Sequence, residues 1–265
     1  MSAAFAALAA VTLFAGTPSG PAAPRPESVP VPVLIYHVIA PAPAGAPFPG
    51  LYVPPPRFVS QMDALASSGY QAVTLDQVWR AWHGDGGLPA RPVVISFDNG
   101  YRTQYTRALP VLRRLGWVGD ENLQLTGLPP AQGGLSVEQI RGLVSAHWEL
   151  DTQGYDHVDL IGLNPAQLRY QISAARTVIR RRFHVPADWF CYPSGDYNAT
   201  VVAEVRAAGY VGATTVVAGW ARPGEDPYRL PRLRVLGGTS APELLALIAD
   251  ARVDPPPPPA YPPRG

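Results

Sequence analysis

Residues 93–105, VVISFDNGYRTQY, are the stretch of the sequence that decides the fold. A run of apolar, strand-forming residues ends abruptly at Asp98, Asn99 and Gly100. Such a run is typical of a buried strand, and an Asp-Asn-Gly sequence is typical of the turn that follows one. A carboxylate and a carboxamide therefore emerge together where a buried strand ends. The residues alone leave two interpretations of Asp98 open, a catalytic base or a helix cap or turn residue.

Helix and strand patterns alternate along the chain on both sides of this stretch. Apolar periodicity and capping residues predict helices at 58–68, 76–83, 104–115, from Ser136, from Asn164 through 183, at 199–208 and from Ser240. Apolar, strand-forming runs predict strands at 71–75, 91–97, 148–151 and 189–192. Alternating strands and helices indicate a parallel sheet or barrel covered by helices, with the functional site in the loops after the strands.

The composition indicates a globular protein with no strong electrostatic field. The chain has 265 residues, of which 47% are hydrophobic, and its formal net charge is +1. This charge balance gives no support to a nucleic-acid partner and suits neutral ligands better. The single cysteine, Cys191, excludes an internal disulfide. The oligomeric state is not indicated by the sequence.

The two ends of the chain differ from its centre. Residues 3–15 form an apolar run too short to span a bilayer as a helix, and small residues and prolines follow it. This pattern predicts a signal peptide, although the usual positive n-region is missing, and an uncleaved segment would instead tie the N-terminus to a membrane. We therefore expect an extracellular or cell-envelope protein. The predicted organisation is a signal-like segment and linker at 1–30, one domain at 31–252, and a polyproline-type tail at 253–265.

Polar groups follow three of the predicted strands, in SFDNG at 96–100, LDTQGYDH at 150–157 and CYPSGDYN at 191–198. With VPVLIYH at 31–37 before them, the chain resembles the polysaccharide deacetylases, the carbohydrate esterases that share the homology domain of the nodulation chitooligosaccharide deacetylase. The resemblance covers about residues 31–248 and includes GYQAVTLDQV, ALPVLRRLG and DPYRLPRLRV. It implies an α/β fold, a single distorted (β/α) barrel.

The resemblance also implies a metal site with unusual ligands. In the family a divalent metal, often zinc, sits on an Asp and two His and polarises an acetamide carbonyl, while a neighbouring Asp takes a proton from water. The matching positions here are Asp98 for the base and Asn99, Gln153 and His157 for the ligands. Only His157 keeps the usual type, and a neutral carboxamide is a weak zinc ligand. Two changed ligands predict a weak or absent metal site, although a branch resembling the muramic-acid deacetylases also has Asn at position 99.

The remaining motifs imply a saccharide groove. The resemblance assigns five residues to substrate binding: His37, Tyr192, Pro193, Gly195 and Tyr197. In the family the backbone amide of the tyrosine at position 192 helps to hold the oxyanion, and an arginine often stands where this chain has Cys191. A C-terminal histidine usually acts as general acid, but every histidine here lies at or before His184. Asp120, Glu121 and Asn122 stand where relatives have an apolar strand, which predicts an extra carboxylate near the mouth.

Each assigned residue also has a structural interpretation. His157 and His37 could make only local hydrogen bonds, and the tyrosines could only pack. The main functional hypothesis is an exported hydrolase that removes N-acetyl groups from a cell-wall or extracellular glycan, an N-acetylated polysaccharide or peptidoglycan. The alternative is a protein of the same fold that binds saccharide and has lost the chemistry. Removal of O-acetyl groups by the same residues cannot be separated from the first hypothesis by sequence.

Overall fold

The structure is a computed structural model that describes residues 26–128 and 133–252. The signal-like run at 3–15 and the proline-rich tail at 253–265 lie outside the described residues, so both remain predictions. In the part of the chain that the structure describes, no helix is long and apolar enough to cross a membrane.

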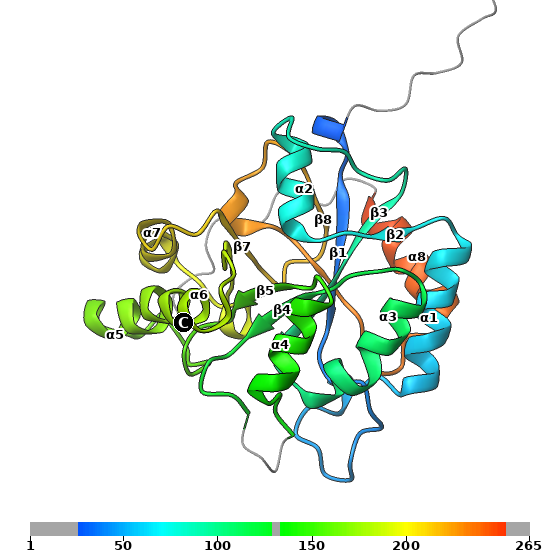
Figure 1. Cartoon of the computed structure of the whole chain (residues 1–265), viewed down its shortest axis with the longest axis horizontal. Coiled ribbons are helices and arrows are strands. Elements are labelled where there is room, and N and C mark those ends of the chain that lie inside the picture. Colours follow the sequence, from blue (N-terminus) through cyan, green and yellow to red (C-terminus); the bar gives the residue numbers. More distant parts are fainter. Residues whose placement is uncertain (1–25, 129–132, 253–265) are drawn as a thin grey trace, which may run out of the picture.

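A curled, mostly parallel sheet forms the centre of the molecule (Figure 1). Its strands are β1 (Val31–Tyr36), β2 (Gln71–Ala72), β3 (Pro92–Asn99), β4 (Asp120–Leu123), β5 (Glu149–Thr152), β6 (Trp189–Cys191), β7 (Gly212–Thr214), β8 (Trp220–Ala221) and β9 (Leu233–Arg234). The main path runs β7-β6-β5-β4-β3-β1-β8, with β2 paired to β3 and β9 paired to β1. Only β8 is antiparallel to its neighbour, β1. The sheet is an open half-barrel, which confirms the distorted (β/α) barrel.

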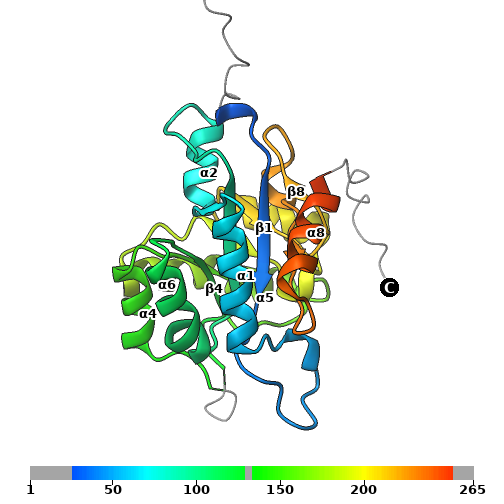
Figure 2. The same ribbon diagram turned by 90° about the vertical axis from the view of Figure 1, so that its right-hand side faces the viewer.

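Helices cover the outside of this sheet (Figures 1 and 2). They are α1 (Pro55–Ser67), α2 (Leu75–Trp82), α3 (Leu109–Arg114), α4 (Val137–Ser145), α5 (Pro165–Arg169), α6 (Ala175–Phe183), α7 (Ala199–Ala207) and α8 (Ala241–Arg252). Capping boxes begin α4 at Ser136 and α5 at Asn164, as the sequence predicts. In the predicted helix at 104–115 a π-helical turn, Gln104–Ala108, runs directly into α3, and Pro110 lies just after this turn.

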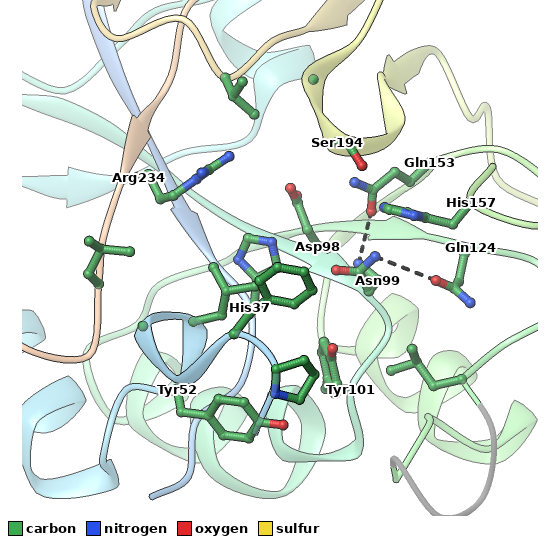
Figure 3. A pocket seen from close by; sticks show the side chains of 18 of the residues that line it. His37, Tyr52, Asp98, Asn99, Tyr101, Gln124, Gln153, His157, Ser194 and Arg234 are labelled. Carbon is green, nitrogen blue, oxygen red and sulfur yellow. Dashed lines mark hydrogen bonds between the residues drawn. The ribbon is translucent and has the colours of Figure 1, made fainter. Parts of the chain in front are cut away.

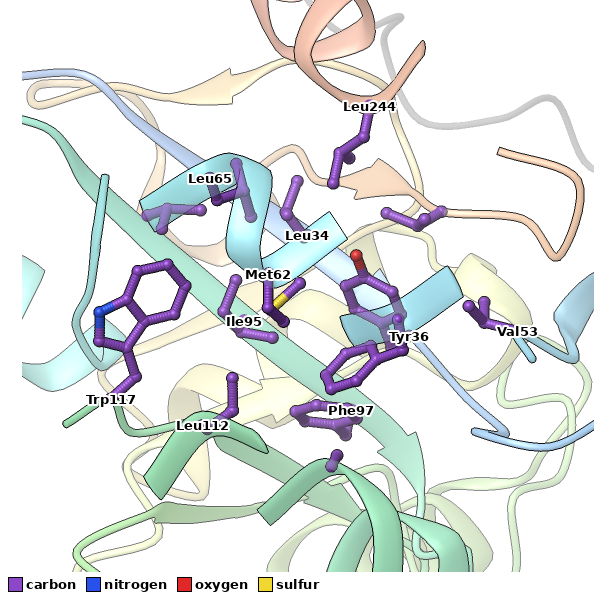
Figure 4. Close-up of a cluster of buried hydrophobic side chains, with 14 of the residues drawn as sticks. Leu34, Tyr36, Val53, Met62, Leu65, Ile95, Phe97, Leu112, Trp117 and Leu244 are labelled. Atoms are coloured by element: carbon purple, nitrogen blue, oxygen red, sulfur yellow. The ribbon is translucent and has the colours of Figure 1, made fainter. Parts of the chain in front are cut away.

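The largest apolar cluster lies between the sheet and the helices α1, α3 and α8 (Figure 4). Ile95 and Phe97 of β3 lie in this cluster with Met62 of α1. Because side chains alternate along a strand, Ser96 and Asp98 face the other side of β3, the interior of the half-barrel. The apolar packing of β3 thus fixes the direction in which Asp98 points.

The polar residues of β4 are fully part of the sheet. Asp120 pairs in register with Ser96, and Asn122 pairs with Asp98. The Asp120 carboxylate accepts a hydrogen bond from Leu75 N–H at 2.9 Å, at the start of α2, and does not line the cavity. Glu121 is buried with no hydrogen-bond partner for its carboxylate among the described residues. The expectation of an extra carboxylate at the mouth is therefore wrong for Asp120, which lies two residues before Asn122 along the strand.

Candidate active site

A cavity of about 830 Å³ opens at the carboxyl ends of the parallel strands (Figure 3). Seven of the residues predicted for the site line it: His37, Asp98, Asn99, Gln153, His157, Tyr192 and Gly195. They come from the ends of β1, β3, β5 and β6 and from the loops that follow. The strand order therefore brings these residues together, and the volume lies in the range of small-molecule sites.

A sharp turn after β3 sets the position of Asn99. Asn99 and Gly100 both have left-handed backbone angles, with φ of 78° and 87°. Asparagine tolerates this conformation better than most residues. A Cβ atom at Gly100 would lie 2.6 Å from Leu123 Cδ1, so the turn needs glycine at this position. The turn holds the Asn99 side chain at the cavity while Asp98 stays in the strand.

Asp98 forms a buried ion pair with Arg232, whose side chain is fully enclosed. Arg232 Nη1 donates to Asp98 Oδ1 at 2.9 Å, and Nη2 donates to Oδ2 at 3.0 Å. Asn122 Nδ2 donates to Oδ1 at 2.9 Å. Both carboxylate oxygens of Asp98 thus bind the side chains of Arg232 and Asn122, not the backbone N–H groups of a helix start or a turn. The interpretation of Asp98 as a helix cap or turn residue is therefore wrong.

The charge of Asp98 follows from these partners. Burial is the largest influence on its pKa and raises it, but the Arg232 guanidinium and the hydrogen bonds from Arg232 and Asn122 lower the pKa to about 2. Asp98 is therefore ionised throughout the neutral pH range.

Arg232 is a residue of this site that the sequence analysis missed. Its Nη2 lies 3.1 Å from Cys191 Sγ, and its Nε donates to the Thr215 carbonyl at 2.9 Å. Cys191 stands where relatives often have an arginine, so a guanidinium reaches this place from the segment before β9. The signal in the sequence was Arg232 itself, which lies between apolar residues in RLPRLRV. An arginine that is buried among apolar residues needs a partner for its charge.

The donors around the predicted metal position do not fit a tight zinc site. Gln153 Oε1 accepts a hydrogen bond from Asn99 N–H at 3.1 Å, so its amide oxygen supports the turn. Asn99 Nδ2 lies 3.5 Å from Gln124 Oε1. Within the described residues, no three or more His, Cys, Asp or Glu side chains are grouped so that they could hold a metal ion. One imidazole and two neutral amides leave the ion without a charged ligand.

Two histidines face the cavity in their neutral form. Burial is the main cause that lowers the pKa of His37 to about 4; the nearby Asp98 opposes this shift, and Arg232 and Arg234 add to it. Burial also lowers the pKa of His157. His37 Nδ1 is buried and has no hydrogen-bond partner within the described residues. Near pH 7 neither ring carries a positive charge into the cavity.

The third motif forms one wall of the cavity. Tyr192 N–H donates to the Thr214 carbonyl at 3.3 Å. This backbone amide is therefore already used in a hydrogen bond and is not free to bind the oxyanion in the way that the resemblance implied. Tyr197 stacks on Tyr192 with ring centroids 4.7 Å apart and is buried beneath it. Pro193 is also buried, behind the wall. Gly195 has a φ of 85°, and a Cβ there would overlap Val216, so glycine is needed to keep the wall in place.

Comparisons with known proteins agree with this architecture. A family model described as polysaccharide deacetylase matches residues 85–213. The YxkH protein of Bacillus subtilis, which is named for the same family, is 28% identical over 211 residues, covering 79% of this chain and 73% of that protein. A poly-β-1,6-N-acetyl-D-glucosamine N-deacetylase of Escherichia coli is 42% identical over 53 residues, only 20% of this chain and 8% of that protein.

Solved structures show the same fold. The Streptococcus pyogenes deacetylase PplD, in complex with acetate, superimposes with a TM-score of 0.76 at 23% identity, covering 83% of this chain and 99% of that one. The BA0330 protein of Bacillus anthracis superimposes with a TM-score of 0.74 at 25% identity, covering 83% and 69%. Residues 85–213 therefore match the polysaccharide deacetylase family, and the chain shares the fold of the PplD and BA0330 proteins.

Proposed function

We propose that this protein is exported and hydrolyses N-acetyl groups of a cell-wall or extracellular glycan in the cavity at Asp98. The observation that carries the proposal is an ionised carboxylate, fixed by Arg232 and Asn122, at a cavity large enough for a sugar. The signal-like residues 3–15 support export.

The proposed chemistry uses Asp98 as the base. Water attacks the acetamide carbonyl carbon, and Asp98 accepts the proton that the water loses. The C–N bond then breaks, acetate leaves, and the proton passes to the departing amine. Because a base with a pKa of about 2 accepts a proton reluctantly at neutral pH, we expect slow turnover. No step is assigned to a metal, because the donor set at Asn99 and Gln153 does not fit one.

A second candidate is saccharide binding without hydrolysis. The observation that favours it is that both oxygens of Asp98 are held by the Arg232 guanidinium, while Gln153 is used to support the turn. A carboxylate in a bidentate pair gives up much of its capacity to accept a proton. Both candidates use the same cavity and the same class of ligand, so they differ only in acetate release.

The deciding experiment measures acetate released from N-acetylated chitooligosaccharides and peptidoglycan, with and without Zn²⁺ or Co²⁺. O-acetylated sugars run in parallel separate N- from O-deacetylation. We expect slow release by the wild type and none by Asp98→Asn, while Asp250→Asn, an exposed change on α8, releases acetate as the wild type does. Thermal unfolding of each variant checks that it is folded.

The outcomes separate the two candidates. Equal release by the wild type and folded Asp98→Asn would contradict the role of Asp98. No release by any form, with glycan binding retained, would establish the binding candidate instead. N-terminal sequencing of protein recovered from the culture medium tests export, and protein found only inside the cell would contradict it.

A further inference from the structure

The segment around β9 runs from the neighbourhood of Asp98 to the rim of the cavity, and every second side chain along it faces the cavity. Leu233 and Val235 are each 1% exposed and belong to the core. By alternation, Arg232, Arg234 and Leu236 face the opposite side, where Arg232 binds Asp98. β9 is parallel to β1, with Arg234 opposite Ile35, so the chain runs toward the mouth. Arg234 therefore lies about 7 Å beyond Arg232 along the strand.

Arg234 brings a positive charge into the cavity and forms no ion pair within the described residues. It lines the cavity and is exposed, and Figure 3 shows its side chain directed inward from β9. Within the described residues it makes no hydrogen bond or ion pair, in contrast to Arg232. Of the two carboxylates of the lining, Asp98 pairs with Arg232, whereas Asp156 Oδ2 accepts from the neutral amide of Gln171, Nε2, at 2.7 Å, and neither contacts Arg234.

An apolar ledge lies beside Arg234. Phe48 is 69% exposed and Leu236 is 45% exposed, and both line the cavity. The loop that carries Phe48 is fixed to the segment after β9, because Gly237 N–H donates to the Gly50 carbonyl at 2.8 Å. Exposed apolar side chains gathered at a cavity mark a ligand-binding surface, and an aromatic ring suits the apolar face of a sugar.

We propose that Arg234, Phe48 and Leu236 form a subsite for an anionic sugar next to the sugar that reacts at Asp98. The substrate class is then an N-acetylated glycan that carries an oxyanion, a carboxylate or a phosphate, on the neighbouring residue. The planar guanidinium of arginine matches both groups, and the apolar ledge supports the sugar ring that presents them. This inference rests on the proposed function for the location of the reacting sugar.

The test compares three N-acetylated oligosaccharides of equal length: a neutral one, one with a uronic acid and one with a phosphate ester. Binding is measured by isothermal titration calorimetry with wild type, Arg234→Gln, Arg234→Lys and the control Arg113→Gln, which removes an exposed arginine on α3. We expect the wild type and the control to bind at least one anionic oligosaccharide about fivefold tighter than the neutral one, as for an exposed ion pair. Arg234→Gln should lose this preference, and Arg234→Lys should keep part of it.

Two results would overturn the subsite. One is equal binding of neutral and anionic oligosaccharides by the wild type. The other is an equal loss of affinity for all three oligosaccharides in Arg234→Gln, which would make Arg234 a hydrogen-bond donor to sugar hydroxyls. The uronic acid and phosphate arms identify which oxyanion is preferred. Binding is measured separately from acetate release. A protein that binds the anionic oligosaccharide more tightly but releases no acetate would therefore contradict the proposed hydrolysis and still support the subsite.

Discussion

Replacing Arg232 with methionine would remove the guanidinium that binds both oxygens of Asp98 and leave an unbranched apolar side chain in its place. The Arg232 side chain is fully buried and that of Asp98 is 3% exposed, so water cannot replace the lost partner. Asn122 would be left as the hydrogen-bond donor to the carboxylate, with the weak Cys191 thiol 3.7 Å away. The variant therefore tests whether the ion pair holds this site together.

The magnitude follows from two arguments. Removing one partner of a buried ion pair destabilises a protein by about 3 to 5 kcal/mol. The pKa of Asp98 gives a second, smaller figure: lowering it from 3.8 to about 2 corresponds to about 2 kcal/mol at pH 7. That stability is present above the unfolded pKa and is lost as the pH falls through about 2. We expect Arg232→Met to lower the free energy of unfolding by about 2 to 5 kcal/mol at pH 7.

The pH dependence should change in a defined direction. Without Arg232, burial dominates and raises the pKa of Asp98 above 3.8, so the protonated form is favoured in the folded variant. The loss of stability should therefore be smaller at pH 5 than at pH 7. Adding Asp98→Asn to Arg232→Met should recover part of the loss, because the buried charge is then absent.

The assay is urea unfolding followed by tryptophan fluorescence at both pH values. Arg234→Met is the matched control, because it removes an exposed arginine two residues further along the same segment and should change stability by less than about 0.5 kcal/mol. A loss below about 1 kcal/mol for Arg232→Met at pH 7, or an equal loss at pH 5 and pH 7, would refute the reasoning.

Two further predictions concern other parts of the site and the sheet. Asn99→Asp combined with Gln153→His should raise zinc affinity at least about 100-fold in calorimetric titrations, and unchanged affinity would show that the backbone, not the ligand chemistry, limits binding. Glu149 is half-buried, and its loss of hydration raises its pKa to about 7, so its contribution to stability is complete below 4.5 and is lost as the pH rises through 7. Glu149→Gln should therefore flatten the fall in the urea midpoint between pH 5 and pH 8, and identical profiles for both proteins would contradict this.

Local patterns in the sequence predicted the elements well, because those patterns have local causes. The capping boxes at Ser136 and Asn164 need only residues three positions apart. The apolar run before Asp98 predicted β3, and the order of strand ends predicted which residues would share a cavity. The roles assigned to those residues stay predictions.

The sequence did not predict the contacts that set the charge of the site. Arg232 is 134 positions from Asp98, and no periodicity links residues so far apart. Gln153 reads as a replaced metal ligand, and only the turn geometry shows that its oxygen accepts from Asn99 N–H. Likewise, Asp120 reads as an extra carboxylate near the mouth, whereas its register with Ser96 and its hydrogen bond from Leu75 N–H place it away from the cavity.

The replaced ligands and the ion pair are consistent with each other. A divalent cation beside Asn99 would add two positive charges next to Asp98, whose single negative charge Arg232 already balances. Asn99, Gln153 and neutral His157 supply no compensating charge, and uncompensated charge in a poorly hydrated site is costly. A carboxylate at position 99 would supply both a ligand atom and a negative charge, whereas an imidazole at position 153 would supply only a ligand atom. Asn99→Asp alone should therefore restore more zinc affinity than Gln153→His alone.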